Sequence, residues 1–153
     1  MTFIVHGLSP EPFVPLYGLG DDQLAARRAR RVVVDGTGFP ERIEMRDALP
    51  GETLLLVNFE HQAADTPYRS SHAVYVREGA TKTWVGDHLP EVMRRRLLSL
   101  RGFSAGGSMV DADVVEGREA EPVIERLFGN PDVAYIHAHY ARPGCYAARI
   151  DRA

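Results

Sequence analysis

A run that is apolar on both faces of a strand constrains the fold of this chain most strongly. Between Thr53 and Glu60 the residues are apolar at almost every position, and only the end of the run is polar. Because side chains alternate across a strand, such a strand is buried on both sides and lies inside a sheet. The next strand-like run, Ser71 to Arg77, follows a polar loop of about ten residues without a helical pattern, which favours an antiparallel pair. This pairing brings Glu60 and His61 beside His72.

Shorter patterns predict the other elements. Strands are expected at residues 3–5, 31–35, 42–46, 109–115, 132–140 and 145–151, and helices at residues 21–29, 87–100 and 119–128. The last two strands are expected to form a hairpin, because Pro143 and Gly144 fit the second and third positions of a type II turn. About three helices and about seven or eight strands, without strict alternation, predict a single α+β domain with a largely antiparallel mixed sheet.

Composition excludes several classes of function. The chain has 153 residues, 44% hydrophobic and 25% charged, which is ordinary for one globular domain. Its formal net charge of −3 gives no general attraction to nucleic acid or to anionic lipid, so neither is expected as a partner. The chain lacks an apolar run of about 18 residues and a signal-peptide pattern, so we expect no membrane span and a cytoplasmic location. The sequence leaves a homo-oligomer open.

Two pairs of polar residues are candidates for chemistry. His137 and His139 share one face of a predicted strand, and Asp111 and Asp113 share one face of another. One hypothesis is a divalent metal held by His137 and His139 and completed by a nearby carboxylate or by His72. A second hypothesis is metal-free acid–base catalysis by an imidazole–carboxylate pair. A third is a hydrogen-bonded network with a purely structural role. The catalytic candidates are therefore His72, His137, His139, Asp111 and Asp113.

A ligand site is expected beside the same strands. Its candidate residues are Glu60, His61, Arg69, Ser71 and Tyr146. Arg69 can bind a carboxylate or phosphate through two parallel hydrogen bonds, which predicts an anionic small molecule as partner, and an ordinary ion pair is the alternative. Tyr146 is expected to form a wall of the space near the histidine strand.

The sequence contains a single cysteine, Cys145, so an intrachain disulfide is excluded. For a short hairpin loop with an even number of residues, the strand register places Cys145 on the face of Tyr140, away from His137 and His139. A nucleophilic role for Cys145 is therefore not expected, because a thiolate needs a base within hydrogen-bond reach.

Four segments resemble a bacterial family of unknown function, domain of unknown function 1203 (DUF1203). The segments are Tyr68–Arg77, Val110–Val115, Tyr135–His139 and Gly144–Asp151. The resemblance covers nearly the whole chain and implies a small, single-domain bacterial protein. It implies no activity, cofactor or catalytic residue.

Together these patterns favour a small-molecule-binding protein or an enzyme, with a divalent metal as the candidate cofactor. The chemistry would lie in a polar patch on one sheet face, formed by His61, His72, Asp111, Asp113, His137 and His139. The alternative is a non-catalytic binding or interaction module whose histidines are structural.

Overall fold

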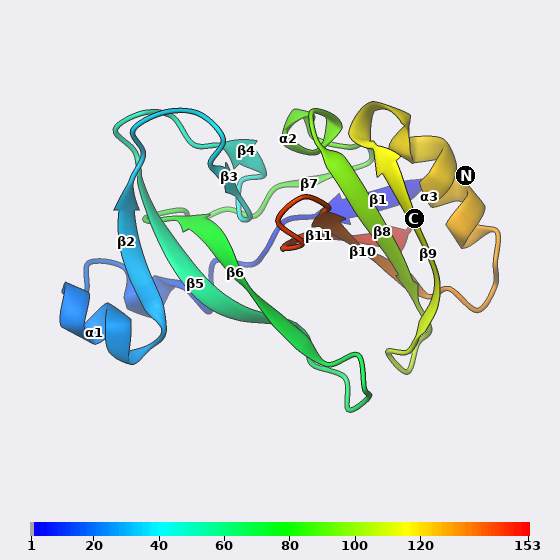
Figure 1. The fold of residues 1–153 in the computed structure, drawn as a ribbon, viewed down its shortest axis with the longest axis horizontal. Coiled ribbons are helices and arrows are strands. Elements are labelled where there is room, and N and C mark those ends of the chain that lie inside the picture. Colours follow the sequence, from blue (N-terminus) through cyan, green and yellow to red (C-terminus); the bar gives the residue numbers. More distant parts are fainter. Residues whose placement is uncertain (1) are drawn as a thin grey trace.

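A computed structural model describes residues 2–153, which form two β-sheets and three α-helices (Figure 1). The larger sheet has the strand order β7 (Val85–Gly86), β1 (Phe3–His6), β11 (Tyr146–Arg152), β10 (Tyr135–Tyr140), β8 (Leu97–Phe103) and β9 (Met109–Glu116). The smaller sheet has the order β2 (Ala29–Val33), β5 (Thr53–Gln62), β6 (Ser70–Arg77), β3 (Pro40–Glu41) and β4 (Arg46–Asp47). The predicted α+β class with largely antiparallel strands is confirmed, but the strands are divided between two sheets.

The smaller sheet is built around the apolar run identified in the sequence. Strand β5 lies between β2 and β6, and Leu54 and Leu55 are fully buried in it. It pairs antiparallel with β6 as expected, and Phe59 lies opposite His72. Helix α1 (Asp21–Ala26) buries Leu24 in the core of this half of the molecule. The helix is shorter than predicted because Arg28 has a φ of 54°, a left-handed conformation that ends it.

A second hydrophobic core lies between the larger sheet and helix α3 (Ala120–Phe128), at the right of Figure 1. Ile124, Leu127 and Phe128 point from the helix into this core at helical spacing. The helix lies within one residue of its predicted bounds.

The final hairpin is present as expected, but its backbone hydrogen bonds, from Gly144 N–H to the carbonyl of Tyr140 and from Tyr140 N–H to the carbonyl of Cys145, close a four-residue loop rather than the predicted type II turn. Gly144 has a φ of 80° in this loop, a left-handed conformation that favours glycine.

Two predicted elements are wrong. The helix expected at residues 87–100 is reduced to α2 (Glu91–Arg94), and strand β8 follows it. Leu98 and Leu100 alternate inward on β8, which lies between β10 and β9, so hydrogen bonding on both edges favours the strand.

The strand expected at residues 42–46 is instead a turn between β3 and β4. The buried carboxylate of Glu41 accepts the backbone N–H groups of Ile43 and Glu44, and these bonds stabilise the turn.

The loop end of the β5–β6 hairpin extends beyond the rest of the smaller sheet and contacts the larger sheet. Gln62 Nε2 donates a hydrogen bond of 2.8 Å to the Tyr135 hydroxyl, and Thr66 Oγ1 donates one of 3.1 Å to the carbonyl of Gly107. In Figure 1 this hairpin runs from the left half of the molecule to the lower right. One face of β10 and β11 is therefore covered by β5 and β6. Within the described part of the chain, no helix is both long enough and apolar enough to cross a membrane.

Candidate functional site

Four histidines and one tyrosine gather where the two sheets meet. The rings come from four strands: His61 (β5), His72 (β6), His137 and His139 (β10), and Tyr146 (β11). The ring centroid of His61 lies 4.9 Å from that of His72, 4.9 Å from that of His139 and 5.6 Å from that of His137. Tyr146 stacks on His61 at 5.0 Å. We call these five side chains the histidine cluster.

The local pattern of each strand explains this convergence. On β10, residues 137 and 139 point to one side, and both are buried, with exposed fractions of 3% and 0%. The antiparallel pairing of β5 and β6 brings His61 to His72, as predicted from the length of the loop. Tyr146 lies opposite His139 because the hairpin loop pairs Tyr140 with Cys145, and a bulge then shifts the β10–β11 register so that Ala138 lies opposite Ala148.

Each of three histidines has one buried ring nitrogen without a hydrogen-bond partner among residues 2–153: Nδ1 of His61, Nδ1 of His137 and Nε2 of His139. The other nitrogen of His139 lies 3.0 Å from the carbonyl oxygen of Gly144. A carbonyl only accepts, so Nδ1 of His139 carries the proton and Nε2 presents a lone pair. His61 Nε2 lies 2.8 Å from His72 Nδ1, which leaves Nδ1 of His61 without a partner.

Burial keeps these imidazoles neutral. It lowers the pKa of His61 from 6.5 to about 4, and the charges of His72 and Arg101 add to the effect. It lowers the pKa of both His137 and His139 to about 3. Neutral imidazole is the form that binds metal ions, so at neutral pH no proton competes for the three lone pairs.

The same three residues are arranged as a possible ligand set. One nitrogen from each of His61, His137 and His139 lies within 4.8 Å of the other two. Zinc binds imidazole nitrogen at about 2.0–2.1 Å, so small ring rotations would bring all three nitrogens onto one ion. The donor set is nitrogen only, which suits zinc, copper, iron or nickel better than magnesium or calcium.

Arg101 on β8 adds a positive charge beside the cluster. It lies directly opposite His137 in the larger sheet, so both side chains are on the same face. Arg101 is half-buried, and burial lowers its pKa. The only hydrogen bond of its side chain within residues 2–153 is a long one of 3.4 Å to Ser99 Oγ, and no carboxylate pairs with the guanidinium there. The site therefore combines neutral nitrogens with one uncompensated cation.

Asp111 and Asp113 do not join the histidines, which corrects the predicted patch. They are opposite Gly102 and Leu100 on β8, whereas His137 and His139 are opposite Arg101 and Ser99. The aspartates therefore lie on the other face of the sheet. There they pair with Arg126 of α3 at 3.3 and 2.6 Å, with their side chains about two-fifths exposed. The spacing places each pair on one face but cannot say whether both pairs share it.

The ligand residues predicted around the β5–β6 loop are only partly at the cluster. Arg69 binds Glu60 through two hydrogen bonds of 3.1 and 3.3 Å, so the ion-pair interpretation describes this arginine. Glu60 therefore does not pair with His72, whose partner is His61. Ser71 is exposed and alternates away from His72, while Ser70 Oγ lies 3.3 Å from His61 Nε2.

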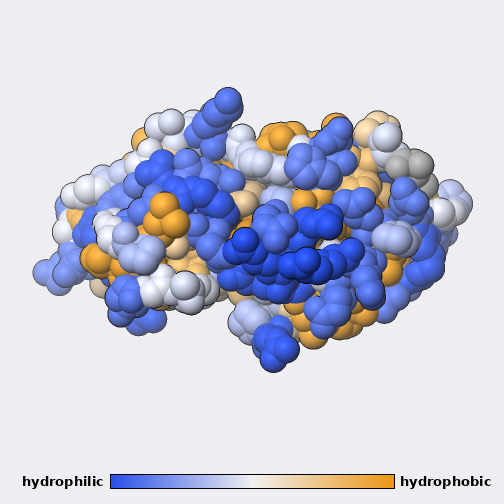
Figure 2. Space-filling model, turned by 90° about the horizontal axis from the view of Figure 1, so that it is seen from above, coloured by the Kyte–Doolittle hydropathy of each residue, from blue (hydrophilic) through white to orange (hydrophobic). Residues whose placement is uncertain are grey.

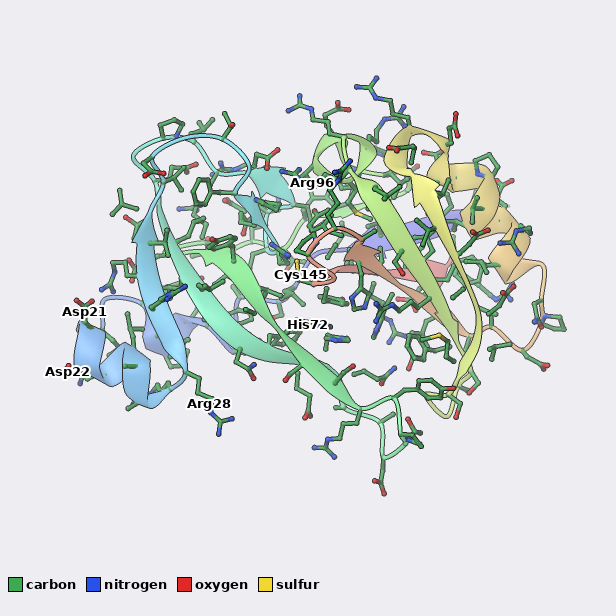
Figure 3. The ribbon with its side chains drawn as sticks, in the orientation of Figure 1. Asp21, Asp22, Arg28, His72, Arg96 and Cys145 are labelled. Carbon is green, nitrogen blue, oxygen red and sulfur yellow. The ribbon has the colours of Figure 1, made fainter. Side chains whose placement is uncertain are left out.

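Cys145 lies outside the histidine cluster, as its predicted face requires. Its Sγ accepts a hydrogen bond of 3.0 Å from Nη2 of Arg42 on the chain between β3 and β4. Figure 3 places Cys145 just above His72, in the middle of the molecule between the two sheets, and Arg96 higher still. Sequence reasoning missed Arg42 and Arg101. A charged residue inside the apolar run of β8 was the available signal for Arg101.

A two-sheet α+β protein with a buried histidine cluster between its sheets is the class defined by this fold and site. The chain belongs to the family described as protein of unknown function (DUF1203), whose model matches residues 38–152. The whole histidine cluster and Arg101 lie within the matched residues. Comparison with curated proteins and with solved structures gives no match.

Proposed function

We propose that this protein binds a divalent transition metal through His61, His137 and His139, and that the metal centre binds or transforms a small molecule. One observation carries the proposal. Three rings from two different sheets each bury a nitrogen without a hydrogen-bond partner among the described residues, and one nitrogen of each lies within 4.8 Å of the others.

A purely structural role explains this arrangement less well. A buried polar atom without a partner costs about 1–3 kcal/mol, so structural networks in protein cores normally satisfy every member. Here the nitrogens without partners are confined to rings that face one another. A bound ion would remove this cost at each of these nitrogens that it takes up, because a lone pair then becomes a coordinate bond.

The ligand number favours a reactive ion over a structural one. Structural zinc sites are closed by four protein ligands, whereas catalytic sites use three and keep a position open. Here the fourth histidine, His72, already has its Nδ1 bonded to His61. An ion held by three ligands would act as a Lewis acid toward a molecule bound at its open coordination position. Arg101, on the same face, would stabilise negative charge that develops there.

Metal analysis of protein purified without chelator is the direct test. We expect close to one equivalent of zinc or another transition metal per chain, and its loss after dialysis against a chelator. Calorimetric titration of the stripped protein with Zn²⁺ should then restore one equivalent. The double variant His137→Ala, His139→Ala should bind none.

The matched control is His88→Ala, because the side chain of His88 is 65% exposed and outside the cluster. This variant should retain the metal. If the wild-type protein neither carries nor takes up a transition metal, the proposal is wrong. Uptake that is equal in the double variant and in wild type would also contradict it, because the ion would then bind elsewhere.

A further inference from the structure

A cavity of about 700 Å³ adjoins the histidine cluster on the side of α2. His72 belongs to both, because it lines the cavity and its ring also contacts His61 and His139. Figure 3 shows His72, Cys145 and Arg96, all of which line the cavity, one above another between the sheets. The volume suits a small organic molecule.

Positive charge predominates in the lining. Four arginines and the carboxylate of Glu116 line the cavity. Arg95 and Arg96 already pair with Glu91 and Asp47 outside the lining, at 3.1 and 2.6 Å. Arg42 and Arg142 form no ion pair within residues 2–153. Figure 2, which looks onto the side of α2, shows a band of strongly hydrophilic residues across this face of the molecule.

Arg42 is the buried charge of the cavity, with an exposed fraction of only 2%. Its hydrogen bonds go to the carbonyl oxygens of Tyr146 and Pro40 and to Sγ of Cys145. A guanidinium has more N–H groups than these acceptors use, and none of them is a carboxylate. Burying a charge without an opposite charge is costly, so a bound anion would compensate Arg42.

Tyr140 provides an independent indication at the same place. It is 2% exposed and lines the cavity, and its hydroxyl has no hydrogen-bond partner in the described part of the chain. The guanidinium of Arg42 lies over its ring at 5.0 Å. Burial raises the pKa of Tyr140 to about 12, so the hydroxyl stays protonated and available as a donor. A hydroxyl donor on a ring whose face is covered by a buried guanidinium is suited to an oxyanion.

We propose that this cavity binds an organic anion, a carboxylate or a phosphate ester, whose charged group pairs with Arg42 and accepts a hydrogen bond from Tyr140. Leu97, Ala73 and Pro143 provide apolar lining for the rest of the molecule. The site deepens the proposed function, and rests on it, in that such an anion would be the small molecule presented to the metal centre past His72. In this proposal the residue that binds the anionic group is Arg42 rather than Arg69, the residue expected from the sequence.

The test is an NMR titration of ¹⁵N-labelled, chelator-treated protein with benzoate and, separately, with inorganic phosphate at constant ionic strength. We expect saturable shifts of the amides of Ala73, Leu97 and Cys145 with at least one probe. Saturation by benzoate identifies a carboxylate ligand, and saturation by phosphate identifies a phosphate ester. If neither probe produces saturable shifts at these amides, the proposal is wrong.

Tyr140→Phe is the informative variant. It removes a hydroxyl without a partner, so folding loses no hydrogen bond, while the anion loses a donor and its dissociation constant should rise about tenfold. Arg69→Gln is the matched control and should leave the dissociation constant unchanged, because Arg69 pairs with Glu60 outside the cavity. Equal affinities of Tyr140→Phe and wild type would overturn the assigned position of the anion.

The double variant His137→Ala, His139→Ala separates this proposal from the metal site. In the presence of chelator it should bind the probe as wild type does, because neither residue lines the cavity. Anion binding by a protein that takes up no metal would leave the cavity assignment intact and refute only the proposed metal centre. Metal uptake without anion binding would leave the proposed metal centre intact and refute the cavity assignment.

Discussion

Acid should destabilise the metal-free protein through its two most buried histidines. Burial lowers the pKa of His137 and of His139 from 6.5 to about 3, so between these values the unfolded chain binds more protons than the folded one. Stability from this source is complete above pH 6.5 and is lost progressively as the pH falls toward about 3. At about pH 5 the solution is about 1.5 pH units below the unfolded value, which costs about 2 kcal/mol for each histidine. The two together approach about 4 kcal/mol, a large part of the 5–15 kcal/mol stability of a typical domain.

Urea denaturation at about pH 7.5 and about pH 5, with chelator present, measures this loss. The variant His137→Asn removes one titrating ring, so its loss between the two pH values should be about 2 kcal/mol smaller than that of wild type. Only the difference between pH values is compared, so any constant effect of the substitution cancels. The control His88→Asn alters a side chain that is 65% exposed and should behave as wild type. If His137→Asn and wild type lose the same stability, burial of the His137 imidazole does not control the acid response.

Three further substitutions test the Asp113–Arg126 ion pair and the packing of the larger sheet's core. Asp113→Asn should change metal affinity less than about twofold in calorimetry and stability by less than about 1 kcal/mol, because its partner Arg126 is exposed on the other sheet face. Ile124→Ala should lower the free energy of unfolding in urea by about 2–5 kcal/mol, because α3 buries this side chain completely. Gly117→Ala should lower the melting temperature by several degrees, since a Cβ there would lie 2.0 Å from the carbonyl oxygen of Met93, and an unchanged melting temperature would contradict this packing.

The features predicted correctly from sequence are those encoded within one strand or one short connection. The apolar run of β5 predicted its place inside a sheet, and the polar loop after it predicted the antiparallel partner β6. The contact between His61 and His72 follows from these two facts alone. The shared face of His137 and His139 needed only the two-residue repeat of a strand.

Relations between distant strands were not encoded in this way. Asp111 and Asp113 share a face, but the β8–β9 register decided which one, and it placed them opposite Gly102 and Leu100 rather than opposite Arg101. The register itself depends on β8, whose leucines fit a helix face as well as a strand. Because a helix was expected up to residue 100, no strand was predicted over residues 97–103, and Arg101 was not considered as a neighbour of His137.

The division of the strands between two sheets could not be predicted from local sequence patterns either. Each predicted strand has a face that can be buried, yet nothing in its own sequence says which sheet covers it. Arg42 shows the consequence most clearly. Its neighbours at the cavity, Tyr140 and Cys145, are about a hundred residues away in the chain and lie in the other sheet or its final hairpin.

Because His61 belongs to one sheet and His137 and His139 to the other, an ion bound by all three would act as a reversible crosslink between the halves of the molecule. Closing such a long loop in the chain is entropically unfavourable, so the complete ligand set exists only after the two halves have docked. The affinity for metal would then include the free energy of docking, and weaker docking would appear as weaker metal binding. Substitutions of Gln62, which donates to the Tyr135 hydroxyl across the two sheets and is not one of the proposed ligands, would thereby tune the affinity of the centre.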